Sequence, residues 1–241
     1  MDCPKPMMKL SVYQLGLVEY PAAEELQKWL AGEIAAGRQT PALLLLEHPH
    51  VYTFGRQGNQ SHLLWSAEEL NKKGISLHWT DRGGDITYHG PGQLVGYPII
   101  PLADLDTLGY LRKLEEVLIQ TLADFGIQSE RVEGQTGVWV SSEGDNPAPQ
   151  KIASIGVRVD ANRITRHGFA LNVAPDMSYW DGMLACGLEN QAKTSMAQLL
   201  PLTPSVEQVI PQVIDRFSAV FNAQASALSL PDFPGGRKAN V

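Results

Sequence analysis

Short apolar runs alternate with amphipathic stretches along the chain, and this pattern predicts a mixture of strands and helices. The runs predict strands at 10–15, 42–47, 51–54, 75–79, 93–100, 137–141, 152–159 and 169–173. Apolar residues at a helical spacing predict longer helices over 22–36, over 106–125 and over 205–224. The apolar face expected for the second helix consists of Leu108, Leu111, Val117, Leu118, Leu122 and Phe125.

Local signals mark several boundaries of these elements. Ser66 and Glu69 are spaced as a capping box for a short helix that ends near Gly74. Residues 160–163 predict a hairpin turn between two strands. Pro211 should kink or split the last helix, because proline cannot donate to the helical ladder.

The order of the elements indicates the fold class. Strands outnumber helices and strict βαβ alternation is absent, which disfavours a doubly wound Rossmann fold. We expect a single α+β domain with a mixed β-sheet flanked by helices. The expected boundaries are 8–225 for the domain, with 1–7 and 226–241 as flexible termini.

Composition narrows the class of protein. The 241 residues are 44% hydrophobic and 19% charged, which excludes a disordered chain, and no apolar run approaches the roughly 20 residues of a membrane-spanning helix. The net charge of −7 argues against a broad nucleic-acid surface. The two cysteines, Cys3 and Cys186, cannot build a disulfide framework or a zinc site, and the first residues do not resemble a signal peptide. We therefore expect a cytoplasmic protein.

The most unusual segment is residues 82–93, RGGDITYHGPGQ, which combines four glycines with polar side chains. Glycine lets a ligand approach the backbone, and exposed N–H groups can hold a carbonyl oxygen or a phosphate. The alternative is a glycine-rich hairpin with structural duties only. The segment matches neither a phosphate-binding Walker loop nor a dinucleotide fingerprint.

Three further segments could carry chemistry. Lys151 opens an otherwise apolar strand, although a solvated lysine at a strand end is the common case. His167 precedes Gly168 and an apolar run that could border a pocket, but a lone histidine is more often structural than catalytic. Cys186 stands beside Gly187 among turn signals, which suits a reactive thiol better than core packing, although a lone cysteine needs a nearby base or cation to react.

Together these segments resemble one family, the lipoate–protein transferases, or octanoyl-[acyl-carrier-protein]:protein N-octanoyltransferases. The family's RGG-x-x-TYHGPGQ signature stands at 82–93, its KIASIG strand at 151–156, its HGFALNV segment at 167–173 and its Cys-Gly at Cys186. The resemblance covers roughly residues 10–220. One departure is Ala185, where the family often has proline before the cysteine.

The resemblance implies the fold of the biotin/lipoate ligase catalytic domain and an acyl transfer. The octanoyl donor would be the phosphopantetheine thioester of acyl carrier protein. The acceptor would be a lysine of a lipoyl domain, in E2 subunits of 2-oxoacid dehydrogenases or in the glycine-cleavage H protein. The resemblance implies no cofactor or metal and no nucleic-acid or membrane partner.

The resemblance also assigns roles to residues. Cys186 would be the nucleophile, and Lys151 would favour its thiolate and move protons. His89 ranks below Lys151 as a base. The expected substrate-binding residues are Arg82, Gly83, Gly84, Asp85, Ile86, Thr87, Tyr88, His89, Ser154, Ile155, Gly156, Gly168, Phe169 and Ala170.

Three details of that site are predicted less directly. Backbone N–H groups near 154–156 and 168–170 would stabilise the oxyanion. Leu171, Ile155 and Tyr88 are candidates to line the acyl chain. Because both protein partners should be acidic, a basic patch is expected around the mouth, from Arg82, Arg158, Arg163, Arg166 and Lys193.

Other functions compete with this interpretation. An ATP-dependent lipoate or octanoate ligase could use the same fold, although it would need no catalytic cysteine. A non-catalytic module that binds acyl groups or lipoyl domains would need neither Lys151 nor Cys186. A cysteine hydrolase would need a water-filled pocket and a His/Asn pattern that the sequence lacks.

Overall fold

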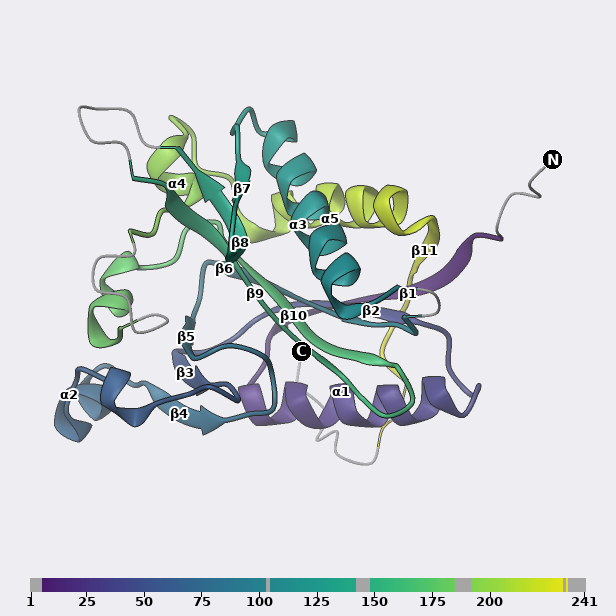
Figure 1. Cartoon of the computed structure of the whole chain (residues 1–241), viewed down its shortest axis with the longest axis horizontal. Helices are drawn as coiled ribbons and strands as arrows, with labels where there is room; N and C mark the ends of the chain where they lie inside the picture. Colours follow the sequence, from purple (N-terminus) through teal and green to yellow (C-terminus); the bar gives the residue numbers. More distant parts are fainter. Residues whose placement is uncertain (1–5, 103–104, 142–147, 185–191, 232, 234–241) are drawn as a thin grey trace.

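A computed structural model describes residues 6–102, 105–141, 148–184, 192–231 and 233. An eight-stranded sheet has the order β11-β1-β2-β6-β10-β9-β8-β7 (Figure 1). Its strands are β1 (Met8–Leu17), β2 (Ala42–Glu47), β6 (Gln93–Ile99), β7 (Glu130–Val132), β8 (Gln135–Val140), β9 (Gln150–Val159), β10 (Thr165–Asn172) and β11 (Ala223–Ala227). β1 pairs in parallel with β2 and β11, whereas the other pairs are antiparallel. The predicted α+β fold with a mixed sheet is confirmed.

A smaller sheet lies beside the large one and has the order β4-β3-β5. Its strands are β3 (Val51–Phe54), β4 (Ser76–Trp79) and β5 (Ile86–His89). The predicted strands 42–47 and 51–54 both form, but they belong to different sheets. His48 occupies the passage between them, where its ring nitrogens hydrogen-bond the Val18 carbonyl and the Tyr97 hydroxyl at 2.6 and 2.8 Å. Burial lowers the pKa of His48 to about 4, so the imidazole is neutral there.

Helices cover both faces of the large sheet, as Figure 1 shows. The helices are α1 (Tyr20–Ala35), α2 (Ala67–Lys72), α3 (Thr107–Asp124), α4 (Met196–Leu199) and α5 (Val206–Phe221), with short 3₁₀ turns η1 (Gln60–His62) and η2 (Met177–Gly182). Strand β2 is buried on both faces: Leu43 and Leu45 join the core under α3 and α5, and Leu44 and Leu46 join the core under α1. This two-sided burial explains why the strand is continuously apolar.

The local helix signals are confirmed with two corrections. The capping box forms, with the Glu69 N–H donating to Ser66 Oγ at 3.3 Å and the Ser66 N–H donating to Glu69 Oε2 at 2.8 Å. Leu108 is 59% exposed, because the buried stripe of α3 begins at Tyr110. Helix α5 is not split at Pro211. Pro211 has no N–H to donate to the carbonyl of Glu207, but Glu207 lies in the exposed first turn of α5.

The first and last strands lie close to the expected domain boundaries of 8 and 225. β1 begins at Met8, and β11 ends at Ala227. The N–H of the next residue, Leu228, donates to the Val12 carbonyl at 3.0 Å, a normal hydrogen-bond distance. Strands β5, β7 and β11 and helix α4 carried no clear signal in the sequence. Among the described residues, no helix is long and apolar enough to cross a membrane.

Candidate active site

A pocket of about 620 Å³ opens between the signature segment and strands β9 and β10. Every residue predicted to bind substrate lines this pocket except Tyr88. The lining members of that set are Arg82, Gly83, Gly84, Asp85, Ile86, Thr87, His89, Ser154, Ile155, Gly156, Gly168, Phe169 and Ala170. The fold thus brings together three segments far apart in the sequence, while their role in substrate binding stays a prediction.

Arg82 organises the signature loop from inside. Its side chain is 7% exposed and donates to the carbonyls of Gly83 and Asp85 at 3.0 and 2.7 Å, and to Thr53 of β3. These bonds fix the loop against the small sheet. The expectation that Arg82 belongs to a basic docking patch is therefore wrong, because its guanidinium is buried among backbone acceptors.

Two glycines let β9 and β10 approach their neighbours closely. A Cβ on Gly156 would lie 2.9 Å from the Gly83 carbonyl oxygen, and a Cβ on Gly168 would lie 2.1 Å from the Gly96 carbonyl oxygen. Side chains at these positions would push the strands away from the signature loop and from β6.

His89 ties the signature to the opposite wall. Its Nδ1–H donates to Gln93 Oε1 at 2.8 Å, and Gln93 donates to Asn172 Oδ1 at 3.0 Å. Asn172 in turn donates to the Thr194 carbonyl at 2.9 Å. Burial, with a smaller contribution from His48, lowers the pKa of His89 well below the ordinary value. His89 is therefore a neutral member of a buried hydrogen-bond chain.

Lys151 lies at one end of the pocket and is only 8% exposed, so the alternative of a solvated strand-end lysine is wrong. Its Nζ stands 4.5 Å from the centroid of the Trp139 ring. Its backbone N–H donates to the Ala192 carbonyl at 2.9 Å, and its carbonyl accepts from the Thr194 N–H at 3.0 Å. The residues that follow the Cys-Gly segment in the chain are therefore bonded to β9 at Lys151.

Cys186 falls within 185–191, and Cys3 within 1–5, both outside the described residues. The flanking residues are described. The Leu184 N–H donates to the His62 carbonyl at 2.8 Å, and Ala192 is held at Lys151.

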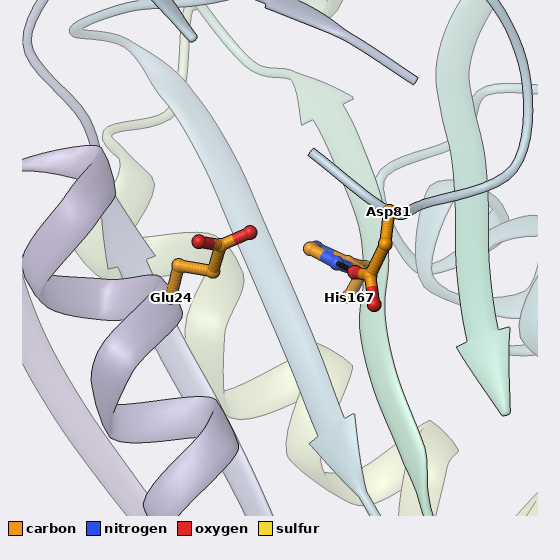
Figure 2. A group of neighbouring side chains, drawn as sticks. All are labelled: Glu24, Asp81 and His167. Carbon is orange, nitrogen blue, oxygen red and sulfur yellow. Dashed lines mark hydrogen bonds and ion pairs between the residues drawn. The ribbon is translucent and has the colours of Figure 1, made fainter. Parts of the chain in front are cut away.

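His167 is the centre of a second polar cluster beside the pocket (Figure 2). Its backbone has a φ of 57°, a left-handed conformation that is rare for residues other than glycine. Its Nε2–H donates to Asp81 Oδ1 at 2.8 Å, and Arg166 donates to the other oxygen of Asp81. Glu24 of α1 joins through Thr80, whose hydroxyl donates to Glu24 Oε1 at 2.8 Å. Because both oxygens of Asp81 are engaged, we interpret the cluster as a clamp between α1, β10 and the residue before Arg82.

The contacts around Asp81 also show that two more arginines of the expected basic patch face a carboxylate. Arg166 is 8% exposed and forms an ion pair with Asp81, and the Arg158 guanidinium lies 3.7 Å from the same carboxylate. Arg163 donates to the Leu105 carbonyl at 2.8 Å. Of the predicted patch, Lys193 alone lines the pocket without being buried.

Tyr88 and Leu171, predicted to line the acyl chain, lie elsewhere. The Tyr88 ring is buried in the core of the small sheet, and its hydroxyl is 2.9 Å from His50 Nδ1. Leu171 packs in the core under α3 and α5. Of the three candidates, only Ile155 lines the pocket.

Comparison with known proteins identifies the family. Residues 19–218 match the model of the lipoyl protein ligase A/B catalytic domain. The chain is 41% identical to the octanoyltransferase of Chloroflexus aggregans, over 92% of this chain and 100% of that one. It is 44% identical to the octanoyltransferase of Mycobacterium ulcerans, over 96% of this chain and 95% of that one. This chain belongs to the octanoyltransferase family. It is an acyltransferase.

Solved structures agree on the fold of this octanoyltransferase. A bipartite lipoate protein ligase from Thermoplasma acidophilum superimposes with a TM-score of 0.71 at 16% identity, over 93% of this chain and 88% of that one. A lipoate-protein ligase A bound with ATP gives a TM-score of 0.68 at 16% identity, over 94% of this chain and 90% of that one. At these identities the likeness establishes the ligase-type fold and nothing finer.

Several pocket residues of the octanoyltransferase were missed from the sequence. They are Tyr20, Arg56, Gln57, Tyr97, Thr107, Leu111, Gly134, Gln135 and Thr136. They come from α1, β6, α3, β8 and two turns, and the glycines beside Arg56 and at Gly134 gave only the local signal of a turn.

Substituting Asp81 with asparagine should lower the stability of the octanoyltransferase in a pH-dependent way. The hydrogen bond from His167 and the charge of Arg166 hold the pKa of Asp81 well below its usual range. Its contribution to stability is therefore complete above the pKa of an unfolded aspartate, about 3.9, and declines as the pH falls below that value. We expect Asp81→Asn to cost about 2 kcal/mol at pH 7, less than a fully buried pair, because the Asp81 side chain is 41% exposed.

Urea unfolding at pH 7 and at pH 3 measures this effect. The stability gap between the wild-type protein and Asp81→Asn should narrow at pH 3. Asp215→Asn, on the exposed side of α5, removes a carboxylate outside any clamp and serves as the control. A gap that is equal at both pH values would show that Asp81 acts without its charge.

Proposed function

We propose that this octanoyltransferase moves an octanoyl group from the phosphopantetheine thioester of acyl carrier protein to a lysine of a lipoyl domain. The acceptors would be E2 subunits of 2-oxoacid dehydrogenases and the glycine-cleavage H protein. A thioester is already activated, so the transfer needs no ATP and no cofactor. The observation that carries the proposal is the burial of Lys151 at one end of the pocket that the signature segment lines.

Cys186 would be the nucleophile. Its thiolate attacks the thioester carbonyl, the pantetheine thiolate leaves, and the octanoyl group remains on Cys186 as a new thioester. The acceptor lysine then attacks as a neutral amine, releases the Cys186 thiolate and loses a proton as the amide forms. Such a thiolate requires a reducing compartment, so we place the reaction in the cytoplasm.

Lys151 would serve both steps. A free thiol titrates near pH 8.5, so a neighbouring ammonium is needed to favour the thiolate at neutral pH. The Lys151 ammonium can then give a proton to the departing pantetheine thiolate. In the second step the neutral Lys151 amine can take the proton from the acceptor lysine.

Strand geometry supports one of the predicted candidates as an oxyanion donor. Ser154 and Gly156 face Ala170 and Gly168 across the β9–β10 ladder. The carbonyl of Val157 points away from β10, since it accepts from the Gly83 N–H of the signature segment at 2.9 Å. Because backbone groups alternate along a strand, the N–H of Ile155 is also directed to the pocket side. We propose that this N–H contributes to the oxyanion hole.

The acyl chain would lie against the apolar part of the lining. Ile155, Phe169, Ile86 and Leu111 supply apolar surface along the pocket. Each buried methylene adds about 0.8 kcal/mol of binding, so a slot of this kind favours the octanoyl chain over shorter acyl groups.

Intact mass spectrometry tests the proposed function. After incubation with octanoyl-carrier protein and no ATP, we expect the wild-type protein to gain the mass of one octanoyl group. Cys186→Ser should lose both the labile thioester and the transfer to a lipoyl domain. Cys3→Ser should retain both, because it removes the other cysteine of the chain. Transfer without any adduct would favour direct aminolysis, and transfer that depends on ATP would favour a ligase.

A further inference from the structure

The charge of the pocket is opposite to that of the whole chain. The chain has a net charge of −7. Among the described residues that line the pocket, the cations are Arg56, Arg82, Lys151 and Lys193, and the carboxylate is Asp85. An acidic protein that concentrates cations in one pocket favours a ligand that carries negative charge there. An octanoyl chain carries none, so a cation that neither the fold nor the proposed chemistry uses would serve another part of the substrate.

Arg56 is the cation best placed to meet that charge. The guanidinium of Arg82 is engaged by Thr53 and by the loop carbonyls. Lys151 and Lys193 lie together at the other end, where their backbones form a bridge. Arg56 is exposed, and among the arginines in the described part of the chain it is the one whose side chain has no hydrogen bond or ion pair. Asp85 does not neutralise Arg56, because its carboxylate accepts from the Asn59 N–H at 3.1 Å and from His62.

The backbone of Arg56 is fixed against the signature loop. The N–H groups of Gly55, Arg56 and Gln57 donate to the carbonyls of Asp85, Arg82 and Gly84 at 3.1, 2.9 and 3.1 Å. A Cβ on Gly55 would lie 2.3 Å from the Gly84 carbonyl oxygen, so the turn cannot approach the loop in this way with another residue there. A long side chain on such a fixed turn can reach the pocket mouth without any rearrangement of the backbone.

The distance between Arg56 and Lys151 fits one part of the donor. The Gly83 N–H donates to the Val157 carbonyl, so the Arg56 end of the pocket lies at Val157, six residues along β9 from Lys151. Six residues of a strand span about 20 Å. A pantetheine arm between its sulfur and its phosphate is as long as roughly four to five extended residues, about 16 Å. The side chains of Lys151 and Arg56 can close the difference at the two ends.

We propose that Arg56 binds the phosphate of the phosphopantetheine arm while the thioester lies at the Lys151 end. The inference rests on the proposed function, because it takes the octanoyl donor to be a phosphopantetheine thioester. An arginine suits this ligand, since its planar guanidinium can give two parallel hydrogen bonds to phosphate oxygens.

Two small donors test the proposal without the carrier protein. Octanoyl-pantetheine lacks the phosphate, and octanoyl-4′-phosphopantetheine carries it. The rate of octanoyl adduct formation, as kcat/KM by intact mass spectrometry, is measured for the wild-type protein, Arg56→Gln and Arg56→Lys. Arg56→Gln should lose about tenfold with the phosphorylated donor and less than twofold with octanoyl-pantetheine. Arg56→Lys should recover part of the loss, because it keeps the charge without the two parallel bonds.

Controls separate this inference from the proposed function. Lys9→Gln removes an exposed cation of β1 outside the pocket and should leave both rates unchanged. Equal losses with both donors, or no loss with either, would overturn the phosphate contact. A loss seen only with intact octanoyl-carrier protein would also overturn it and would assign Arg56 to the surface of the carrier. A wild-type protein that forms no adduct with any donor would overturn the proposed function itself, and this inference with it.

Discussion

Replacing Lys151 with methionine is expected to slow the formation of the octanoyl adduct at pH 7 by about 10²–10³-fold. In the proposed mechanism the Lys151 ammonium favours the Cys186 thiolate, so its loss would leave less thiolate at neutral pH. Loss of the proton donor also slows departure of the pantetheine thiolate, and general acids typically contribute at least about 10²-fold. Methionine preserves much of the contact with the Trp139 ring, so the effect reports on the lost amine.

Lys151→Arg separates the two contributions of the amine. Arginine stays charged at any accessible pH and cannot take part in proton transfer. Single-turnover adduct formation and the rate of alkylation by iodoacetamide are measured against pH. Lys151→Arg should keep the alkylation profile of the wild-type protein but lose transfer, whereas Lys151→Met should shift the alkylation profile to higher pH. If Lys151→Met leaves the alkylation profile unchanged, Lys151 does not act on the thiol.

Replacing Arg82 with methionine is expected to lower the free energy of unfolding by about 4 kcal/mol and to abolish acyl transfer. The substitution leaves the carbonyls of Thr53, Gly83 and Asp85 without their donor. Each orphaned buried acceptor costs about 1–3 kcal/mol. The loop that these bonds hold forms one wall of the pocket, so its release removes the site as well as stability.

Urea unfolding followed by far-ultraviolet circular dichroism measures this loss. Arg56→Met removes the same chemical group from the exposed turn next to the loop and should change the free energy of unfolding by less than about 0.5 kcal/mol. Arg82→Lys should recover only part of the stability, because an ammonium cannot reach three acceptors in a planar fork. A stable Arg82→Met protein would mean that the loop is held by its glycine contacts alone.

Sequence patterns predicted those parts of the fold that depend on neighbours along the chain. The capping box at Ser66 and Glu69 needs only residues three apart, and it formed as expected. The predicted strands 42–47 and 51–54 also formed, but nothing local indicates that the chain between them passes into a second sheet. Strand β5 was missed because the surrounding glycines favour a loop, whereas its pairing with β3 is tertiary.

The candidate site was likewise predicted where short stretches of sequence are unusual and missed where tertiary contacts decide. The segments around Arg82, Lys151 and Gly168 were found because their residues are unusual in short stretches, and all of them line the pocket. Arg56 and Tyr20 reach that pocket from segments with no chemical pattern. The environment of each side chain was also hidden: an arginine at 82 reads as surface charge until the buried carbonyls around it are known.

The parallel pairing of β1 with β11 joins positions near opposite ends of the chain, since Met8 faces Ala223. During synthesis β1 is made long before its outer partner. Until β11 has been made, the outer edge of β1 has unpaired backbone N–H and C=O groups, which can pair with another copy. The short strand after α5 therefore completes this edge of the sheet only after most of the chain has been made.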